Sequence, residues 1–199
     1  MDTWEALTII GIISFSIQGS LIAMEKRLDI FAVYTLGLLT SFGGGILQNA
    51  LIGGIDYKIW NQEWLFYIAV ISITVAIIFP KSVIKGEMWW SKILDAFGTI
   101  AFAIQGGINA IKFGLPTSAI VVSALVTATG GGIIRDLLSQ RKSILLRENI
   151  YMFWIFLIGI IMGFIGQDII AYKYLLFIVF STLRILSFVY GWRVPYRDY

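Results

Sequence analysis

Long apolar runs dominate the chain and alternate with short polar connectors. Each run has about 20 residues, the length that an α-helix needs to cross the hydrocarbon core of a bilayer. Tryptophan and tyrosine, which favour membrane interfaces, stand at the ends of several runs, at Trp60, Trp64, Trp89, Trp90, Tyr151 and Trp192. The pattern predicts an all-α transmembrane fold of seven helices, at roughly 5–24, 30–50, 64–80, 92–112, 117–138, 149–167 and 169–190.

The composition agrees with a membrane protein and excludes several classes of function. Hydrophobic residues make up 58% of the chain, charged residues only 14%, and the mean hydropathy is +0.85. The chain has no cysteine and no histidine, which removes thiolate and Ser-His-Asp catalysis and the usual zinc sites. The carboxylates Asp95 and Asp136 lie in different predicted helices and form no known catalytic motif. We therefore expect no enzyme, no metal site and no cofactor.

The basic residues of the connectors predict how the chain sits in the membrane. One set of connectors holds Lys26, Arg27, Lys81, Lys85, Lys92, Arg141, Lys142, Arg147, Arg193 and Arg197, and the other holds only Lys58, Lys112 and Lys173. Cytoplasmic connectors are the ones enriched in Lys and Arg, so the N-terminus is predicted outside and the C-terminus in the cytoplasm. Asp2 and Glu5, rather than basic residues, precede the first apolar run, which favours a retained helix over a cleaved signal peptide. Because the basic residues are spread over many connectors, no nucleic-acid partner is expected.

The sequence matches itself at an offset of 87 residues. Residues 15–51 align without a gap onto 102–138, with 14 of 37 positions identical. We interpret residues 1–199 as a single membrane domain that contains a duplication. Its parts are a first three-helix repeat (5–90), a second (91–167), a seventh helix (168–190) and a cytoplasmic tail (191–199). An odd number of helices in each repeat places the two repeats in opposite orientations, an arrangement typical of transport proteins. The alternative is a duplicated bundle without a transport role.

Each repeat carries three consecutive glycines in its second helix, within TSFGGGILQN and TATGGGIIRD. These are Gly43, Gly44 and Gly45 in one repeat and Gly130, Gly131 and Gly132 in the other. Each glycine costs a helix about 1 kcal/mol relative to alanine, so the second and fifth helices are predicted to kink or unwind. Freed carbonyls, with the hydroxyls of Thr40, Ser41, Thr127 and Thr129, would then suit a cation. The alternative is that the glycines serve close helix packing, because small residues let helix backbones approach.

Polar side chains follow both triplets inside the predicted membrane region. Gln48 and Asn49 follow the first, and Arg135 and Asp136 follow the second. Ionisable residues at this depth are usually functional, although Arg135 could instead extend to the headgroups with Asp136 as its partner. Asp95 could accept a hydrogen bond from Arg135 if their helices pack together. Gln18 and Gln105 either line a path or join helices by hydrogen bonds. Arg184 is expected to extend to the headgroups.

The chain contains the paired triplets and the motifs GGGIIRD and DAFGTIAFAIQGG. With these motifs it resembles the trimeric intracellular cation (TRIC) channels and their prokaryotic relatives over nearly its whole length. The resemblance implies a homotrimer with a potassium-permeable pore in each subunit, lined by the second and fifth helices and bent at the triplets. Gln48 and Asn49 stand where many relatives repeat the Arg-Asp pair, so this pore is expected to be less symmetric. The chain stops soon after Trp192, without the longer basic tail of eukaryotic members, which implies a prokaryotic plasma membrane. A bound lipid is compatible with the resemblance.

Three classes of function follow from these observations. The leading one is a channel for monovalent cations, K⁺ or Na⁺, without tight selectivity because no TVGYG-like filter is present. The second is a secondary transporter of a small solute such as an amino acid, whose carboxylate would suit a helix N-terminus near Arg135. The third is a membrane subunit that transports nothing.

Overall fold

The computed structural model describes residues 5–52, 63–79, 87–140 and 150–192, and these residues are almost entirely helical. The α-helices are α1 (Glu5–Glu25), α2 (Ile30–Ile52), α3 (Glu63–Ile78), α5 (Glu87–Lys112), α6 (Thr117–Leu138), α7 (Tyr151–Ile165) and α8 (Lys173–Val189). A 3₁₀ helix, η3 (Gly166–Tyr172), joins α7 to α8. No strand occurs in these four stretches. The prediction of an all-α fold is therefore confirmed.

The number of separate helices differs from the prediction. The described residues form six helical segments rather than seven, because α7, η3 and α8 follow one another as one helical run from Met152 to Val189. The chain turns within this run at Gly166, whose φ of 70° lies in the left-handed region that glycine adopts without strain. Five segments are long and apolar enough to cross a membrane, and α3, with 16 residues, is a shorter apolar helix.

α1 and α5 form the centre of the bundle and pack against each other through repeat-equivalent residues. A Cβ atom on Gly11 would lie 2.6 Å from the Phe102 ring, and one on Gly98 would lie 2.3 Å from the Phe15 ring. The two phenylalanines, which correspond at the offset of 87, contact each other edge to face at 5.2 Å. Because residue numbers rise along α1 as they fall along α5, the two helices are antiparallel. The repeat-equivalent helices α1 and α5 thus run in opposite directions, as inverted repeats would require.

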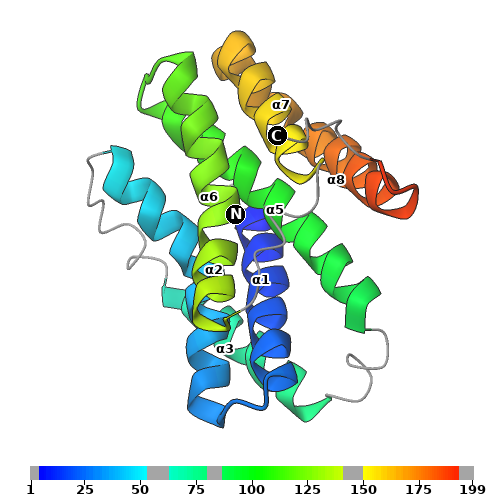
Figure 1. Cartoon of the computed structure of the whole chain (residues 1–199). Helices are drawn as coiled ribbons and strands as arrows, with labels where there is room; N and C mark the ends of the chain where they lie inside the picture. The colour runs from blue at the N-terminus through cyan, green and yellow to red at the C-terminus, as the bar shows by residue number, and fades with distance from the viewer. Residues whose placement is uncertain (1–4, 53–62, 80–86, 141–149, 193–199) are drawn as a thin grey trace, which may run out of the picture.

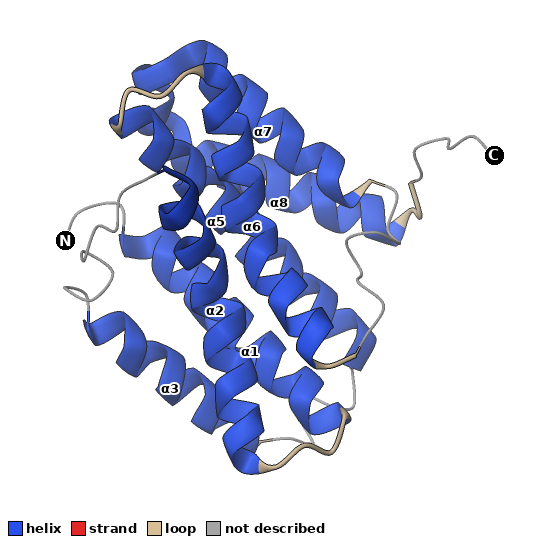
Figure 2. Cartoon of the chain, turned by 60° about the vertical axis from the view of Figure 1, so that its left-hand side comes forward, coloured by secondary structure: helices blue, strands red, loops and turns tan. Residues whose placement is uncertain are grey.

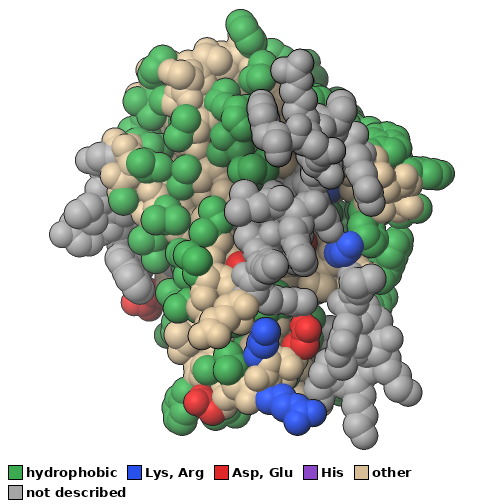
Figure 3. All heavy atoms as spheres, in the orientation of Figure 1, with side chains coloured by type: hydrophobic (Ala, Val, Ile, Leu, Met, Phe, Trp, Pro, Cys, Tyr) green, Lys and Arg blue, Asp and Glu red, His purple; other side chains and the backbone are tan. Residues whose placement is uncertain are grey.

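The other helices surround this centre in the same paired way. α3 contacts α1 and α2, whereas α7 contacts α5 and α6, so that each repeat places its third helix on its own side (Figure 2). α8, which has no counterpart in the first repeat, packs mainly on α5 (Figure 1). Large apolar side chains cover much of the face in Figure 3, and charged side chains gather toward its lower end. Phe31, Ile71, Leu137 and Phe164 are among the exposed apolar residues, a surface suited to lipid.

Candidate functional site

The glycine triplets meet where α2 and α6 cross. A Cβ atom on Gly44 would lie 2.1 Å from the backbone oxygen of Thr127, and one on Gly131 would lie 1.9 Å from that of Thr40. Real Cβ atoms do not approach other atoms so closely, and the obstacles are backbone, which cannot move aside. The contacts are reciprocal at the offset of 87 and run antiparallel. Gly44 and Gly131 therefore let two helix backbones touch, as small residues do in membrane proteins.

The first glycine of each triplet also packs against the opposite helix. A Cβ atom on Gly43 would lie 2.7 Å from the side chain of Ile134, and one on Gly130 would lie 2.8 Å from that of Leu47. These neighbours are ends of flexible side chains, so this packing is less strict than that of the central glycines. The packing alternative thus explains the first two glycines of both triplets.

The third glycines have a different environment. Among the described residues, a Cβ atom on Gly45 would meet nothing within 4 Å, and one on Gly132 would meet only the Nη2 atom of Arg135, at 3.7 Å. Helix–helix packing therefore does not require glycine at either position. The two equivalent positions differ in one respect, which is that the Arg135 guanidinium lies beside Gly132.

Neither triplet unwinds its helix. α2 and α6 are continuous α-helix through Gly43–Gly45 and Gly130–Gly132, so the predicted unwound turn is wrong. The physical reason is that contact between the two helices stabilises the helical backbone at the crossing and offsets the low helix propensity of glycine. The predicted bend of the two helix axes stays a prediction.

The hydroxyls predicted to line a path are buried beside the crossing. Thr40, Ser41, Thr127 and Thr129 each donate to a carbonyl one turn earlier in their own helix, at Leu36, Gly37, Ser123 and Leu125. Their lone pairs remain able to accept a hydrogen bond or contact a cation. Thr40 and Thr127 pack on the neighbouring helices, because their Oγ1 atoms lie 2.6 Å and 2.4 Å from Cβ positions built on Gly19 and Gly106.

A charged cluster lies beyond the crossing, toward the end of α6. Arg135 is 2% exposed and Asp136 is 1% exposed. The Nε atom of Arg135 donates to Asp136 Oδ1 at 2.9 Å, and its Nη2 atom lies 2.8 Å from the same oxygen. Its Nη1 atom donates to Oε1 of Gln18 on α1. Arg135 is thus held inside the bundle between two helices, and the interpretation that it extends to the headgroups is wrong.

Asp95 belongs to the same cluster, but through Gln18 rather than by the expected contact with Arg135. The Nε2 atom of Gln18 donates to Asp95 Oδ1 at 3.1 Å and to the backbone oxygen of Ser91 at 3.1 Å. Asp95 also accepts from Nη2 of Arg184 on α8. Arg184 is 6% exposed, so its predicted position at the headgroups is wrong. The position of Arg184 inside an apolar run could have indicated a buried partner, since intramembrane charges usually have partners.

The equivalent region of the first repeat contains amides instead of charges. Gln48, 2% exposed, donates from Nε2 to the backbone oxygen of Gly106 at 2.9 Å and to the hydroxyl of Ser123. Its Oε1 atom accepts from Asn109 Nδ2 at 3.1 Å. Sequence reasoning missed Ser123 and Asn109, because a single polar residue in an apolar helix carries no distinguishing pattern.

Two other predicted positions lie outside both clusters of hydrogen bonds. Asn49 is half-buried and makes no side-chain hydrogen bond to a described residue. Gln105, the equivalent of Gln18, is half-buried, and its Oε1 atom has no hydrogen-bond partner within the described part of the chain. Across that same part, no three His, Cys, Asp or Glu side chains lie together as metal ligands.

A partly open pocket of about 360 Å³ adjoins the amide cluster. It lies between the last residues of α2, Leu51 and Ile52, and the first turn of α6, at Ser118 and Ala119. Gln48, Leu115, Val122 and Ser123 complete its lining. A helix C-terminus carries partial negative charge and a helix N-terminus partial positive charge. Most of the pocket lining is apolar. The two helix ends place opposite partial charges on its two sides.

The fold and the site define a class: a helical membrane protein with an internal sequence repeat, in which the repeat-equivalent helices α2 and α6 cross at paired glycines. Comparison with known proteins identifies the family within this class. A family model described as "Glycine transporter" matches residues 5–81 and 92–167. The two matched stretches begin 87 residues apart (92 − 5), the offset of the internal repeat. The chain belongs to this family.

The chain is also similar to curated bacterial membrane proteins of the UPF0126 group. UPF0126 membrane protein YvgT of Bacillus subtilis (strain 168) is 44% identical over 198 residues, which cover 98% of this chain and 97% of that protein. UPF0126 inner membrane protein YadS of Escherichia coli (strain K12) is 32% identical over 146 residues, 73% of this chain and 70% of that one. These similarities extend over most of both chains, so this protein is a multi-pass membrane protein of the same kind.

Two solved structures share this fold. A prokaryotic TRIC channel, crystallised in 0.5 M KCl, is 34% identical with a TM-score of 0.87, over 96% of this chain and 98% of that one. The TRIC orthologue from Rhodobacter sphaeroides has the same fold, with a TM-score of 0.87 at 24% identity over 96% and 100% of the two chains. The protein is a homologue of the prokaryotic TRIC channels, as its sequence motifs predicted. TRIC channels are not enzymes, and the prediction that this chain is not an enzyme is confirmed.

Proposed function

We propose that this protein is a channel for monovalent cations, permeable to potassium, with one ion pathway in each subunit of a homotrimer. The observation that carries the proposal is the likeness to a prokaryotic TRIC channel, at 34% identity and a TM-score of 0.87 over nearly the whole chain. The inverted repeats, which meet deep in the bundle, add support, because such repeats commonly enclose a transport pathway.

The pathway proposed here follows one flank of the α2–α6 crossing. At Gly44 and Gly131 the two helices are in backbone contact, which leaves no room for an ion between them. The third glycines face less crowded surroundings, and no described residue lies where a side chain on Gly45 would be. Ser41 lies one turn before Gly45 and offers a hydroxyl oxygen to a cation. We therefore place the pathway along the side of Gly45 and Gly132.

In this proposal Arg135 closes the inner half of the pathway. Its guanidinium lies 3.7 Å from the Cβ position of Gly132, where the equivalent space at Gly45 is open. A positive charge at this point repels a permeant cation and also occupies its space. Opening requires the guanidinium to move to another partner or to follow a bend of α6.

Membrane placement follows from the charge of the connectors. Lys and Arg are concentrated in the connectors after the first, third and fifth predicted helices and in the tail, which supports an outside N-terminus and a cytoplasmic C-terminus in a prokaryotic plasma membrane. Arg135 and Asp136 then lie in the cytoplasmic half, and the amide cluster of Gln48 lies in the outer half. The exposed apolar surface supports contact with lipid and with neighbouring subunits.

The test is single-channel recording of the purified protein in planar bilayers under a KCl gradient. Unitary currents that reverse near the potassium potential are expected, and Arg135→Ala and Gly132→Ala should alter them. Thr182→Ala is the matched control, because Thr182 is exposed on α8 and donates only to its own helix, at Ile178. Absence of current from a well-folded preparation would contradict the proposal.

A transporter of a small amino acid is the second candidate. Two observations favour it: the description of the matching family model as a glycine transporter, and the pocket between the ends of α2 and α6. An amino acid is a zwitterion, and the partial charges at those two helix ends match its ammonium and carboxylate groups. Counterflow of radiolabelled glycine into proteoliposomes distinguishes the two functions, because a channel gives no counterflow.

A further inference from the structure

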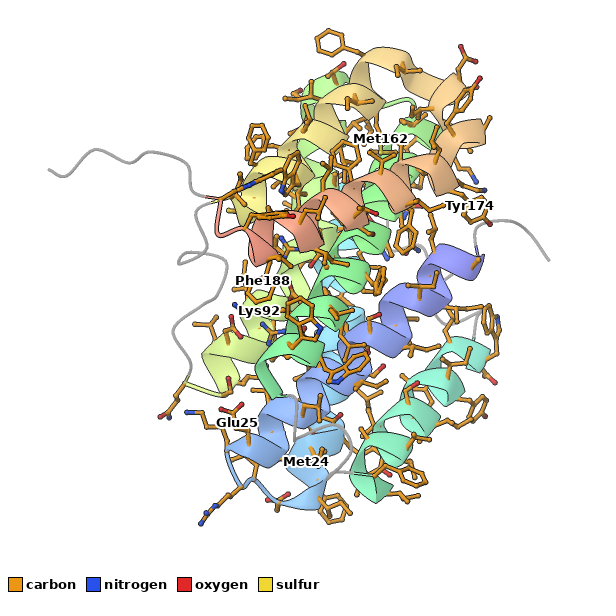
Figure 4. The ribbon with its side chains drawn as sticks, turned by 90° about the vertical axis from the view of Figure 1, so that its right-hand side faces the viewer. Met24, Glu25, Lys92, Met162, Tyr174 and Phe188 are labelled. Carbon is orange, nitrogen blue, oxygen red and sulfur yellow. The ribbon has the colours of Figure 1, made fainter. Side chains whose placement is uncertain are left out.

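α8 lies outside the duplication, yet it is joined to the charged cluster at a defined register. The ammonium of Lys92 on α5 lies 3.7 Å from the centre of the Phe188 ring on α8 (Figure 4). The ring of Trp89 lies 5.5 Å from the same phenylalanine. Arg184 precedes Phe188 by one helical turn, and Asp95 follows Lys92 by about one turn. The contacts of Phe188 therefore hold Arg184 opposite Asp95.

Gln18 connects this ion pair to Arg135. It is completely buried, its Nε2 atom donates to Asp95, and its Oε1 atom accepts from Arg135. An amide has a donor end and an acceptor end, so a reversed Gln18 would place its NH₂ group against the guanidinium and its oxygen against the carboxylate. The orientation of Gln18 thus depends on Asp95, and Arg135 depends on Gln18.

Among the described residues, the first repeat shows no arginine in the equivalent arrangement. Gln105, the counterpart of Gln18, has an Oε1 atom without a hydrogen-bond partner among the described residues. The counterpart of Arg135 is the neutral Gln48, which contacts Gly106, Ser123 and Asn109. Contact with an arginine of α8 is therefore a property of the second repeat, the half that holds the proposed closing residue.

We propose that Arg184 is a positioning residue for the pathway: by binding Asp95 it fixes Gln18, and through Gln18 it holds Arg135 beside Gly132. The inference rests on the proposed channel function for its consequence, but the position of Arg135 can be tested without any current. Arg184 itself does not contact the permeant ion.

The electrostatics give the direction of the effect. Among the described residues, the cluster contains the ion pairs Arg135–Asp136 and Arg184–Asp95, so Arg184 supplies the positive charge that faces Asp95. Without Arg184, Asp95 becomes a buried carboxylate with no cationic partner in the cluster, and such a charge strongly attracts the nearest cation. Arg135 is separated from Asp95 only by Gln18. Removal of Arg184 therefore draws Arg135 toward Asp95 and away from Gly132, which opens the inner half.

The experiment combines current with chemical access. The chain has no cysteine, so Gly132→Cys introduces one reactive thiol at a position where a side chain meets only Arg135. In this background, Arg184→Gln should speed modification by a cationic methanethiosulfonate reagent about tenfold, the ratio that 1.4 kcal/mol produces. Open probability in bilayers should rise by a similar factor. Thr182→Ala on the same helix is the control and should leave both measurements unchanged.

A second variant separates positioning from simple attachment of α8. Asp95→Asn combined with Arg184→Gln removes the carboxylate that would attract Arg135, so both measurements should return to the wild-type values. If Arg184 only attached α8 to α5, the double variant would keep the effect of the single one, which would overturn the proposal. Wild-type behaviour of Arg184→Gln would overturn it as well.

A third variant covers the case in which Arg184→Gln does not fold. Gln18→Leu interrupts the connection while both ion pairs remain, and it should also speed thiol modification. An unchanged rate would overturn the inference. If the wild-type protein gives no current but the thiol rates change as stated, the channel function fails while the positioning of Arg135 by Arg184 stands.

Discussion

The two ends of the α2–α6 crossing have the same backbone arrangement and different chemistry. Beyond Gly131, Arg135 and Asp136 form a charged cluster with residues of α1, α5 and α8. Beyond Gly44, Gln48 occupies the equivalent position and binds neutral groups of α5 and α6. The duplication therefore preserved the close contact of the helices, while the side chains one turn further diverged.

The difference indicates which features the architecture requires and which are specific to one half. The glycine contacts are reciprocal to within a few tenths of an ångström, because a bulkier residue at either central position would force the two backbones apart. The polar clusters do not require one particular residue type, since amides and ion pairs can both supply hydrogen-bond partners to buried polar groups. Functional asymmetry is thus expected in the clusters and not in the crossing.

The largest effect is expected from substitutions at the α2–α6 crossing, which both repeats share. Gly44→Ala and Gly131→Ala each place a Cβ atom about 2 Å from an opposing carbonyl oxygen, and each should destabilise the protein by about 3 kcal/mol or more. Thermal unfolding in detergent, with size-exclusion chromatography, measures the loss. Because the contacts are equivalent, the two variants should lose similar stability. A mild effect of either would contradict the backbone contact seen at the crossing.

The sequence predicted this crossing only in part. The long apolar runs and the repeat located most of the helices, because both are visible along the chain, but they did not show that α7, η3 and α8 form one helical run. They could not decide between unwinding and close packing at the triplets, because glycine favours both outcomes and only the neighbouring helix selects one. The distinction between Gly44 and Gly45 likewise depends on which side of α2 faces α6.

The charged cluster illustrates the other limit. Arg135 and Asp136 were identifiable as ionisable residues inside an apolar run, and Asp95 was a reasonable partner. The intervening Gln18 and the second cation, Arg184, depend on how α1 and α8 pack against α5, which no local pattern encodes. Arg184 was therefore expected at the headgroups although it lies inside the bundle.

Substitution of Arg135 and Asp136 by the residues of the first repeat, Gln and Asn, should make the charged cluster resemble the amide cluster. Arg135→Gln leaves Asp136 without the arginine that it binds and should cost about 3 kcal/mol, as the loss of one partner of a buried ion pair does. Arg135→Gln combined with Asp136→Asn reproduces the Gln-Asn pair of the first repeat and should recover most of that loss. Thermal unfolding of the wild type and the three variants, including Asp136→Asn alone, gives the coupling energy. An additive result would mean that the pair is not coupled.

The amide half should respond less strongly. Gln48→Leu removes hydrogen bonds to Gly106 and Ser123 and the acceptor for Asn109, at an expected cost of about 1–2 kcal/mol. The Gly106 oxygen still accepts from Ser123 at 2.8 Å, which limits the loss. Asn49→Leu is the matched control and should have little effect, because Asn49 is half-buried and makes no side-chain hydrogen bond to a described residue. Equal losses from the two substitutions would contradict the assigned role of Gln48.

The smallest effects come from the third glycines, where the two halves differ only by Arg135. Within the described part of the chain, Gly45→Ala meets no neighbour and Gly132→Ala meets only a guanidinium nitrogen at ordinary contact distance. Each should therefore gain up to about 1 kcal/mol from higher helix propensity. If both positions line the pathway, the added methyl groups should lower unitary conductance even as stability rises. That combination separates a pathway position from a packing position, because a packing glycine loses stability on the same substitution. A loss of stability at either site would place that glycine with Gly44 and Gly131.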